Sequence, residues 1–213
     1  MKRAKINPIP TVVSTFVSDG GKQVGLLKVP SFSTNTVTEM VNGLRAISSG
    51  DENGKLDAIA IDPRVNVGGY MPADVDAAKL FLPARGPSPH HCRNWKAGFS
   101  IKTYDANNID AGTSLPVYLL VNKRTASTAE IFAAALQDNH RAVVVGTSNT
   151  FGKGRIQNVQ PLNGSGVAVT RARCVMPSGR DLHGVGIVPN KEPSRCGMND
   201  SARTCLADVV DVN

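Results

Sequence analysis

The sequence predicts an α/β domain with a sheet at its centre and helices packed over it. Short aliphatic runs without helical periodicity, typical of buried strands, occur at residues 56–61, 117–121 and 142–146. Segments with apolar residues at helical spacing alternate with these runs, as they do in α/β proteins. With 213 residues, 41% hydrophobic and 19% charged, the chain has the composition of an ordinary folded protein.

The first predicted elements have clear boundary signals. Residues 22–29 have the composition of a strand, which Pro30 ends. Thr36 and Glu39 form the pattern of a capping box, which predicts that a helix begins there. The apolar face of this helix, about three turns long, consists of Val37, Met40, Val41, Leu44 and Ile47.

The later elements continue the alternation. Pro72 suits the first turn of a helix over residues 72–81. Residues 82–114 carry prolines and glycines without firm periodicity, and we predict only a hairpin there, around residues 98–104. The elements expected after it are a strand at 117–121, a helix at 127–137, and strands at 142–146 and 167–175. Because the sequence shows no internal repeat and no low-complexity linker, one domain is the simplest account.

The net charge of +7 raises the question of nucleic-acid binding. The basic residues are scattered and the aromatic content is 5%, so we attribute the charge to solubility and expect no nucleic-acid partner. No apolar run approaches the roughly 20 residues that span a bilayer, so we expect no stable membrane insertion. The basic start of the chain is not followed by a prolonged apolar stretch, and no targeting segment is predicted.

Two of the four cysteines, Cys196 and Cys205, lie close together in a polar tail. A short-range disulfide there would suit an oxidising compartment, and two free thiols are the alternative. The triplet His90-His91-Cys92 is too isolated to predict a zinc site. We expect neither a metal nor another cofactor.

Three residues could form a serine–lysine catalytic system. Ser127 follows a predicted strand and begins a helix, where free N–H groups can hold an oxyanion. Lys153 lies between two glycines; if it is buried, desolvation lowers its pKa, and a neutral amine can activate a serine. Gln157 lies four residues further on, so on a strand it would share a face with Lys153 and could orient the amine.

Each of these residues also has an ordinary structural explanation. Serine is a common N-cap, so Ser127 alone is best explained as a cap. Lys153 alone would be a solvated loop lysine, and Gln157 an exposed residue on a strand. The pair Gly68-Gly69 follows a buried strand and forms either a plain turn or a backbone that approaches a ligand closely.

A serine–histidine system is a further alternative. His140 and His183 are the residues that would serve it. Neither has an aspartate partner in a suitable context, and such a partner normally orients the imidazole. The sequence therefore favours lysine over histidine as the base.

Four separated segments resemble those of the carboxyl-terminal processing peptidases, also called tail-specific proteases. They are residues 62–69, with the pattern Asp-x-Arg-x-Asn-x-Gly-Gly, and residues 121–139, 151–157 and 177–187. Their common order makes the resemblance far more specific than any one segment does. It covers residues 22–190.

The resemblance implies a crotonase-like α/β core with a serine–lysine dyad. Ser127 would be the nucleophile, Lys153 the general base, and Gln157 the residue that positions the lysine. The oxyanion would be held by the backbone N–H of Thr128 and of the Gly68-Gly69 pair, with Gly68 preferred.

Other features of the family bear on the organisation of this chain. Asp138 matches a family position that supports the site. The family often has alanine where this chain has Thr128, and either residue supplies a backbone N–H. A PDZ domain that binds the substrate's C-terminus usually precedes the core. About twenty residues precede the first predicted strand here, so we expect a lead-in at 1–21, the catalytic core at 22–190 and a tail at 191–213.

The expected function is cleavage of protein substrates near an exposed C-terminus through an acyl-enzyme intermediate. One alternative is a core that kept the fold but only binds its partner. The other is a crotonase-like acyl-CoA enzyme, which needs neither Ser127 nor Lys153. The resemblance implies the bacterial periplasm or the chloroplast thylakoid lumen, and the sequence predicts no oligomeric state.

Overall fold

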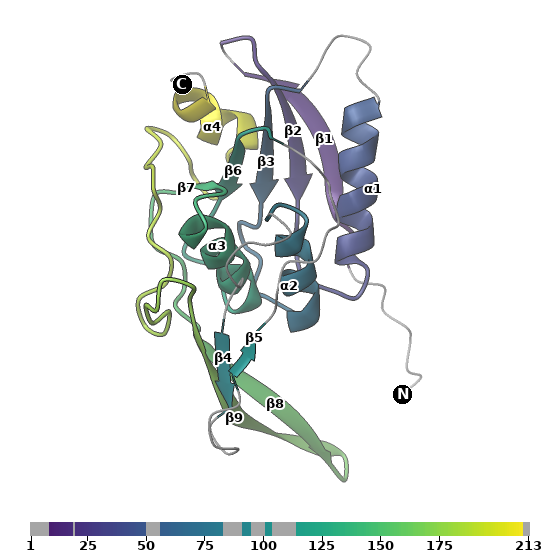
Figure 1. Cartoon of the computed structure of the whole chain (residues 1–213), viewed down its shortest axis with the longest axis vertical. Helices are drawn as coiled ribbons and strands as arrows, with labels where there is room; N and C mark the ends of the chain where they lie inside the picture. Colours follow the sequence, from purple (N-terminus) through teal and green to yellow (C-terminus); the bar gives the residue numbers. More distant parts are fainter. Residues whose placement is uncertain are drawn as a thin grey trace.

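The computed structural model describes residues 9–18, 20–49, 56–82, 91–94, 101–103 and 114–210, which form two sheets and four helices (Figure 1). The central sheet has the strand order β1-β2-β3-β6-β7. Its strands are β1 (Val12–Val17), β2 (Gln23–Lys28), β3 (Ala58–Asp62), β6 (Val117–Leu120) and β7 (Val143–Val145). Strand β1 runs antiparallel to β2, and the other neighbours are parallel. A mixed sheet flanked by helices is the α/β class that the sequence predicts.

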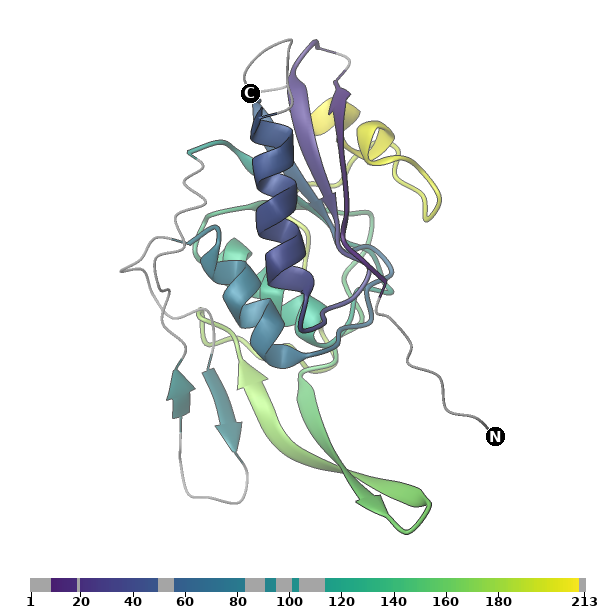
Figure 2. The ribbon, with the colours of Figure 1, turned by 90° about the vertical axis from the view of Figure 1, so that its right-hand side faces the viewer.

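Helices cover both faces of this sheet. Helices α1 (Thr36–Ser49), α2 (Met71–Lys79) and α3 (Thr128–Asp138) pack on one face, and α4 (Ala202–Val210) packs on the other (Figure 2). Along β3, Ile59 and Ile61 join the cluster under α1 to α3, whereas Ala58 and Ala60 join the cluster under α4. Because β3 is buried on both faces, it reads as a continuous apolar run.

The second sheet is antiparallel throughout, with the order β5-β4-β9-β8. It consists of β4 (His91–Asn94), β5 (Ile101–Thr103), β8 (Arg155–Leu162) and β9 (Ser165–Val175). The long β8–β9 hairpin projects away from the central sheet (Figure 1). The hairpin predicted around residues 98–104 lies partly outside the described residues, and β5 is the part of it that is described.

The predicted strands of the central sheet and the first three helices are confirmed, with ends that differ by a few residues. Four elements were missed: β1, β4, β8 and α4. Strand β1 pairs with β2 over its whole length and becomes the edge of the sheet. Helix α4 lies in the polar tail, yet Leu206 and Val209 are buried against the sheet.

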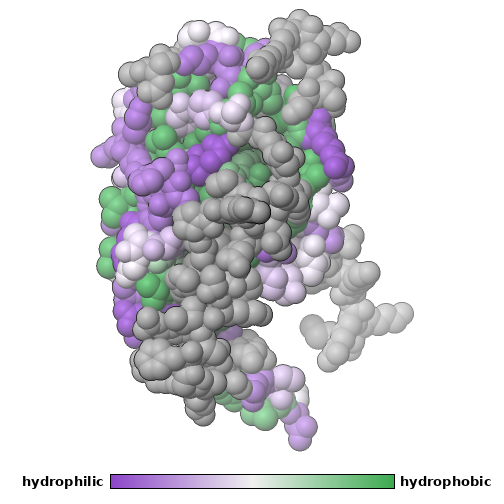
Figure 3. Space-filling model, in the orientation of Figure 1, coloured by the Kyte–Doolittle hydropathy of each residue, from purple (hydrophilic) through white to green (hydrophobic). Residues whose placement is uncertain are grey.

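No helix among the described residues is long and apolar enough to cross a bilayer. The described surface that faces the viewer in Figure 3 has hydrophilic and hydrophobic residues interspersed.

Candidate active site

Ser127 lies in the turn between β6 and α3, at residues 121–127, which we name the nucleophile turn. It occupies the N-cap position of α3 with φ 60° and ψ −125°, a conformation that non-glycine residues rarely adopt. The backbone N–H of Thr128, the first residue of α3, has no acceptor in the described part of the chain. Ser127 therefore sits beside a free donor at a helix start, where negative charge is favoured.

Residues 62–69, which we name the oxyanion loop, pack against this turn. A Cβ on Gly68, where φ is +105°, would lie 2.8 Å from the Ser127 Cβ, so a side chain there has no room. The N–H of Gly68, the preferred second donor, donates to Asn66 Oδ1 over 2.8 Å. The N–H of Gly69 has no acceptor among the described residues. Of the two glycines, Gly69 therefore has the unoccupied donor.

Asn66 joins the oxyanion loop to the nucleophile turn. Its side chain is buried and donates to the Val29 carbonyl oxygen over 2.9 Å. Its own carbonyl oxygen accepts the N–H of Ala126 at 2.9 Å. Nearby, the hydroxyl of Thr125 donates to the carbonyl oxygen of Pro63. Because these groups are buried and satisfied, the loop and the turn form one rigid unit.

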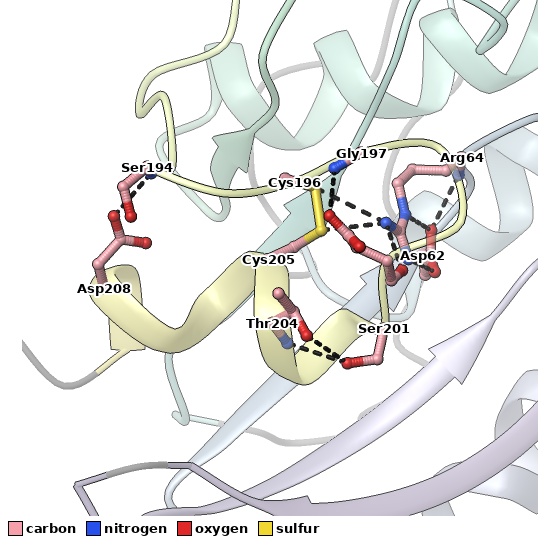
Figure 4. Close-up of a disulfide and its surroundings, with 10 residues drawn as sticks. Asp62, Arg64, Ser194, Cys196, Gly197, Ser201, Thr204, Cys205 and Asp208 are labelled. Carbon is pink, nitrogen blue, oxygen red and sulfur yellow. Dashed lines mark hydrogen bonds and ion pairs between the residues drawn. A yellow bond between two sulfur atoms is a disulfide. The ribbon is translucent and has the colours of Figure 1, made fainter.

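The side chain of Arg64 anchors the oxyanion loop to the C-terminal segment (Figure 4). Its Nε and Nη2 atoms donate to the Asp62 carboxylate over 2.9 and 2.8 Å. Its Nη1 atom lies 3.0 Å from the carbonyl oxygen of Asp200 and 3.0 Å from the Sγ atom of Cys205. Cys205 and Cys196 form a disulfide, so the first of the two explanations for these cysteines is confirmed.

Glu130 connects the nucleophile turn to the loop before β8. It is fully buried. Its Oε2 atom accepts the backbone N–H of Ser127 and that of Lys153, each at 2.8 Å. Its Oε1 atom accepts the Thr150 hydroxyl at 2.5 Å and the Gly152 N–H at 2.6 Å. Four donors therefore converge on one buried carboxyl group, which offsets the cost of burying it.

One oxygen atom of Glu130 thus contacts both backbones, so Ser127 and Lys153 are neighbours in space. Sequence reasoning did not single out Glu130. The signal was present, because Ser127-x-x-Glu130 is a capping-box pattern in which the glutamate reaches back to the N–H of the N-cap residue.

Lys153 lies in the segment 150–154, which we name the lysine loop. Its side chain is exposed, so the expectation of a buried lysine is wrong for this conformation. The two glycines beside Lys153 are needed for a different reason. A Cβ on Gly152 would lie 3.1 Å from the backbone nitrogens of residues 184–186, and one on Gly154 would lie 2.8 Å from that of His183. The glycines let two backbones approach closely, whatever residue lies between them.

The side chain of Gln157 is also exposed, and it has no hydrogen-bond partner in the described part of the chain, although the backbone of Gln157 pairs with Thr170 in β9. The argument from even spacing on one strand is wrong, because Lys153 precedes the first residue of β8, Arg155. A register shift between Ile156 and Gln157 further changes the course of the strand. The structure brings Ser127, Thr128 and the Gly68-Gly69 pair together, with the Lys153 backbone beside them, and it leaves Gln157 on the exposed hairpin.

Asp138 lies at the far end of α3. It accepts hydrogen bonds from Arg180 Nη2 at 2.9 Å and from the Ser178 hydroxyl at 2.8 Å. Helix α3 has 11 residues, so Asp138 lies about 16 Å from Ser127 at 1.5 Å per residue. Its role is to hold the turn at residues 176–180, because proton transfer over that distance is excluded.

No group of three metal-ligating side chains occurs in the part of the chain that the structure describes. The site is a strained serine at a helix start, with two free backbone donors and a lysine loop beside it. This arrangement supplies a hydroxyl group and the backbone donors that serine acyl transfer requires.

The comparisons assign the chain to a family. The profile of peptidase family S41 matches residues 23–192, so the chain belongs to this family. It is 35% identical over 210 residues to a carboxyl-terminal-processing protease of Synechocystis, which covers 98% of this chain and 47% of that protein. It is 33% identical over 207 residues to the chloroplastic carboxyl-terminal-processing peptidase 2 of Arabidopsis thaliana, covering 96% of this chain and 39% of that protein.

A solved structure with a similar fold is that of a photosystem II D1 C-terminal processing protease, with a TM-score of 0.75 and 30% identity. The similarity covers 98% of this chain and 55% of that one. An S41 protease of Bacteroides fragilis, at 19% identity and a TM-score of 0.67, shows the fold alone. The chain spans about half the length, or less, of the curated relatives cited above.

Proposed function

We propose that the chain is a serine-type endopeptidase that cleaves protein substrates near their C-terminus. The main observation behind this proposal is the bridge through Glu130 Oε2, which accepts the backbone N–H of both Ser127 and Lys153 at 2.8 Å. It makes neighbours of the two residues that serve as nucleophile and base in the family's motifs. Relatives with carboxyl-terminal processing in their names support the same substrate class.

The chemistry divides into two acyl-transfer steps. The neutral amine of Lys153 takes the proton of the Ser127 hydroxyl, and the serine oxygen attacks the substrate carbonyl. The N–H groups of Thr128 and Gly69 hold the oxyanion. The lysine then gives its proton to the leaving amine, and water releases the acyl group. Gln157 accepts from the amine and orients it.

The exposed side chain of Lys153 determines when the dyad forms. Lysine has a flexible four-carbon stem, so rotation about the side-chain bonds of the exposed Lys153 can turn its amine from solvent toward Ser127. A peptide lying over the site then separates the amine from water, which favours the neutral form. The substrate therefore completes the dyad.

The proposal also covers the extent of the catalytic core and the compartment in which the chain works. We assign helices α1 to α3 and strands β2, β3, β6 and β7 to a crotonase-like catalytic core over residues 22–190. The disulfide between Cys196 and Cys205 supports an oxidising compartment. Relatives from chloroplasts and from bacteria support the thylakoid lumen or the periplasm.

A fluorophosphonate probe tests the nucleophile. We expect the probe to label the chain and a peptide digest to locate the label on Ser127. The variant Ser127→Ala loses the label and any turnover but keeps its folding, and Ser165→Ala, at the exposed start of β9, is the matched control. A properly folded chain that takes no label would support a binding protein instead.

A further inference from the structure

A polar cavity of about 460 Å³ lies at the base of the β8–β9 hairpin, outside the residues that carry the proposed chemistry. Its volume falls within the range of small-ligand pockets. The cavity is lined by Arg155, Thr170, Ala172, Arg173, Asp181 and His183.

The charges in this cavity are unequal. Arg155 lies directly opposite Arg173 in the register of the hairpin, an arrangement that is unfavourable for like charges. Arg173 is paired with Asp181 through its Nε and Nη2 atoms. The hydrogen bond from Arg173 lowers the pKa of Asp181, so this carboxylate stays charged at neutral pH. Arg155 has no partner among the described residues, which leaves one uncompensated positive charge.

A guanidinium whose N–H groups are unpaired is well suited to bind a carboxylate. Its planar set of donors matches a carboxylate, which it binds through two parallel hydrogen bonds. One carboxylate would also balance the single excess charge of Arg155, Arg173 and Asp181. The cavity therefore has both the charge and the donor geometry for one carboxylate group.

The position of the cavity indicates which carboxylate it meets. In the proposed mechanism, the base that takes the serine proton later gives it to the leaving amine. The C-terminal product must therefore leave past Lys153. Arg155 follows Lys153 by two residues, a span of at most about 7 Å along the chain. Arg155 therefore brings the cavity close to the lysine loop, past which the released segment leaves in the proposed mechanism.

We propose that this cavity binds the terminal carboxylate of the segment that the peptidase releases, with Arg155 as the first ligand and Arg173 as the second. This inference rests on the proposed function, which supplies the direction of the substrate. It gives the catalytic core its own means of recognising a chain end. Substrates with few residues beyond the scissile bond fit best, because their carboxylate and carbonyl must reach both sites at once.

Binding to the Ser127→Ala chain tests the cavity without cleavage. The probes are two fluorescein-labelled decapeptides that end in Leu-Ala-Ala, one with a free carboxylate and one with a carboxamide. Fluorescence polarisation should show the acid binding about tenfold or more tightly, as expected for a charge-assisted contact. Adding Arg155→Gln should remove this preference, and Arg155→Lys should keep part of it. Arg195→Gln, at an exposed position outside the cavity, should leave it unchanged.

Equal affinity for the acid and the amide would overturn the inference, and so would a preference that survives Arg155→Gln and Arg173→Gln together. The outcome is separable from that of the proposed function. If Ser127 takes no fluorophosphonate but the acid preference depends on Arg155, the carboxylate site stands and the peptidase proposal fails.

Discussion

The two halves of the site are built differently. The oxyanion loop and the nucleophile turn are held by buried side chains, among them Asn66 and Thr125, and Arg64 ties the loop to the disulfide. The lysine loop is held through its backbone, by Glu130 and by close packing on residues 183–186. The side chain of Lys153 is exposed, and so is that of Gln157 in the following strand, β8.

This difference separates two requirements of catalysis. Donors for an oxyanion work best when they are fixed before the reaction, because no energy is then spent on orienting them. A lysine that must lose its charge needs a dry environment only while substrate is bound. In the proposed mechanism, the rigid half (the oxyanion loop and the nucleophile turn) would meet the first requirement and the open half (the lysine loop) the second. Glu130 is the contact between the two halves.

Replacing Glu130 should have the largest effect, because it disconnects the two halves. In Glu130→Ala, two buried and two part-buried donors lose their acceptor, and we expect the free energy of unfolding to fall by about 3 kcal/mol. Displacement of the lysine loop by about 1 Å should lower kcat/KM about 100-fold. Chemical denaturation and peptide-cleavage kinetics measure the two effects.

Glu130→Gln retains one acceptor oxygen and should lie between the wild type and Glu130→Ala. The control is Glu192→Ala, an exposed glutamate, which should change neither quantity. If Glu130→Ala kept the kcat/KM of the wild type, the relative position of the two halves would not depend on the Glu130 bridge.

The rigid half was the more predictable from sequence. The aliphatic run of β3 and the glycines after it indicated a buried strand and a close backbone approach. The choice of Gly69 over Gly68 was not predictable, because it depends on the side-chain carbonyl of Asn66, which occupies the N–H of Gly68. Strand β1 was missed although residues 12–17 are rich in β-branched and aromatic residues, a local signal that was available.

The open half was less predictable. Glycines on both sides of Lys153 suggested a buried amine, but their cause is packing against residues 183–186, about thirty positions away in the sequence and brought there by the hairpin. Local spacing cannot show which remote backbone will be the neighbour. Helix α4 was missed for the same reason, because its apolar residues pack on a face of the central sheet that is formed by remote segments.

Removing the disulfide should weaken the rigid half selectively. The double variant Cys196→Ala with Cys205→Ala opens a loop whose two ends are nine positions apart in the sequence. It also removes the contact between Arg64 and the sulfur of Cys205. By the chain-entropy estimate the free energy of unfolding should fall by about 2–3 kcal/mol. Denaturant titration of the oxidised wild type and the variant measures this change.

Hydrogen exchange then distinguishes the halves in the same variant. Amides of the oxyanion loop should exchange faster, whereas those of β8 and β9 should keep the wild-type rate. If amide exchange became faster by the same factor in the oxyanion loop and in β8 and β9, the loss of the disulfide would not act specifically on the oxyanion loop through Arg64.

Asp74, which lies in α2 just after the oxyanion loop, should affect stability in a way that depends on pH. It is fully buried, and neither of its carboxyl oxygens has a hydrogen-bond partner in the described structure. Burial raises its pKa well above the ordinary value of 3.8. The folded state therefore holds the proton more strongly than the unfolded state does, so the contribution of Asp74 to stability is full below pH 3.8 and is lost as the pH rises through the folded pKa.

The variant Asp74→Asn keeps the shape of the protonated side chain and cannot ionise. It should match the wild type in stability near pH 4 and exceed it at neutral pH by about 1.4 kcal/mol for each unit by which the pKa is raised. Denaturant midpoints measured from pH 4 to pH 8 give the difference, with Glu192→Gln, the same kind of exchange at an exposed position, as the control. If the variant is more stable than the wild type by the same amount at every pH, ionisation of Asp74 does not cause the difference. The variant would then stabilise α2 by packing alone.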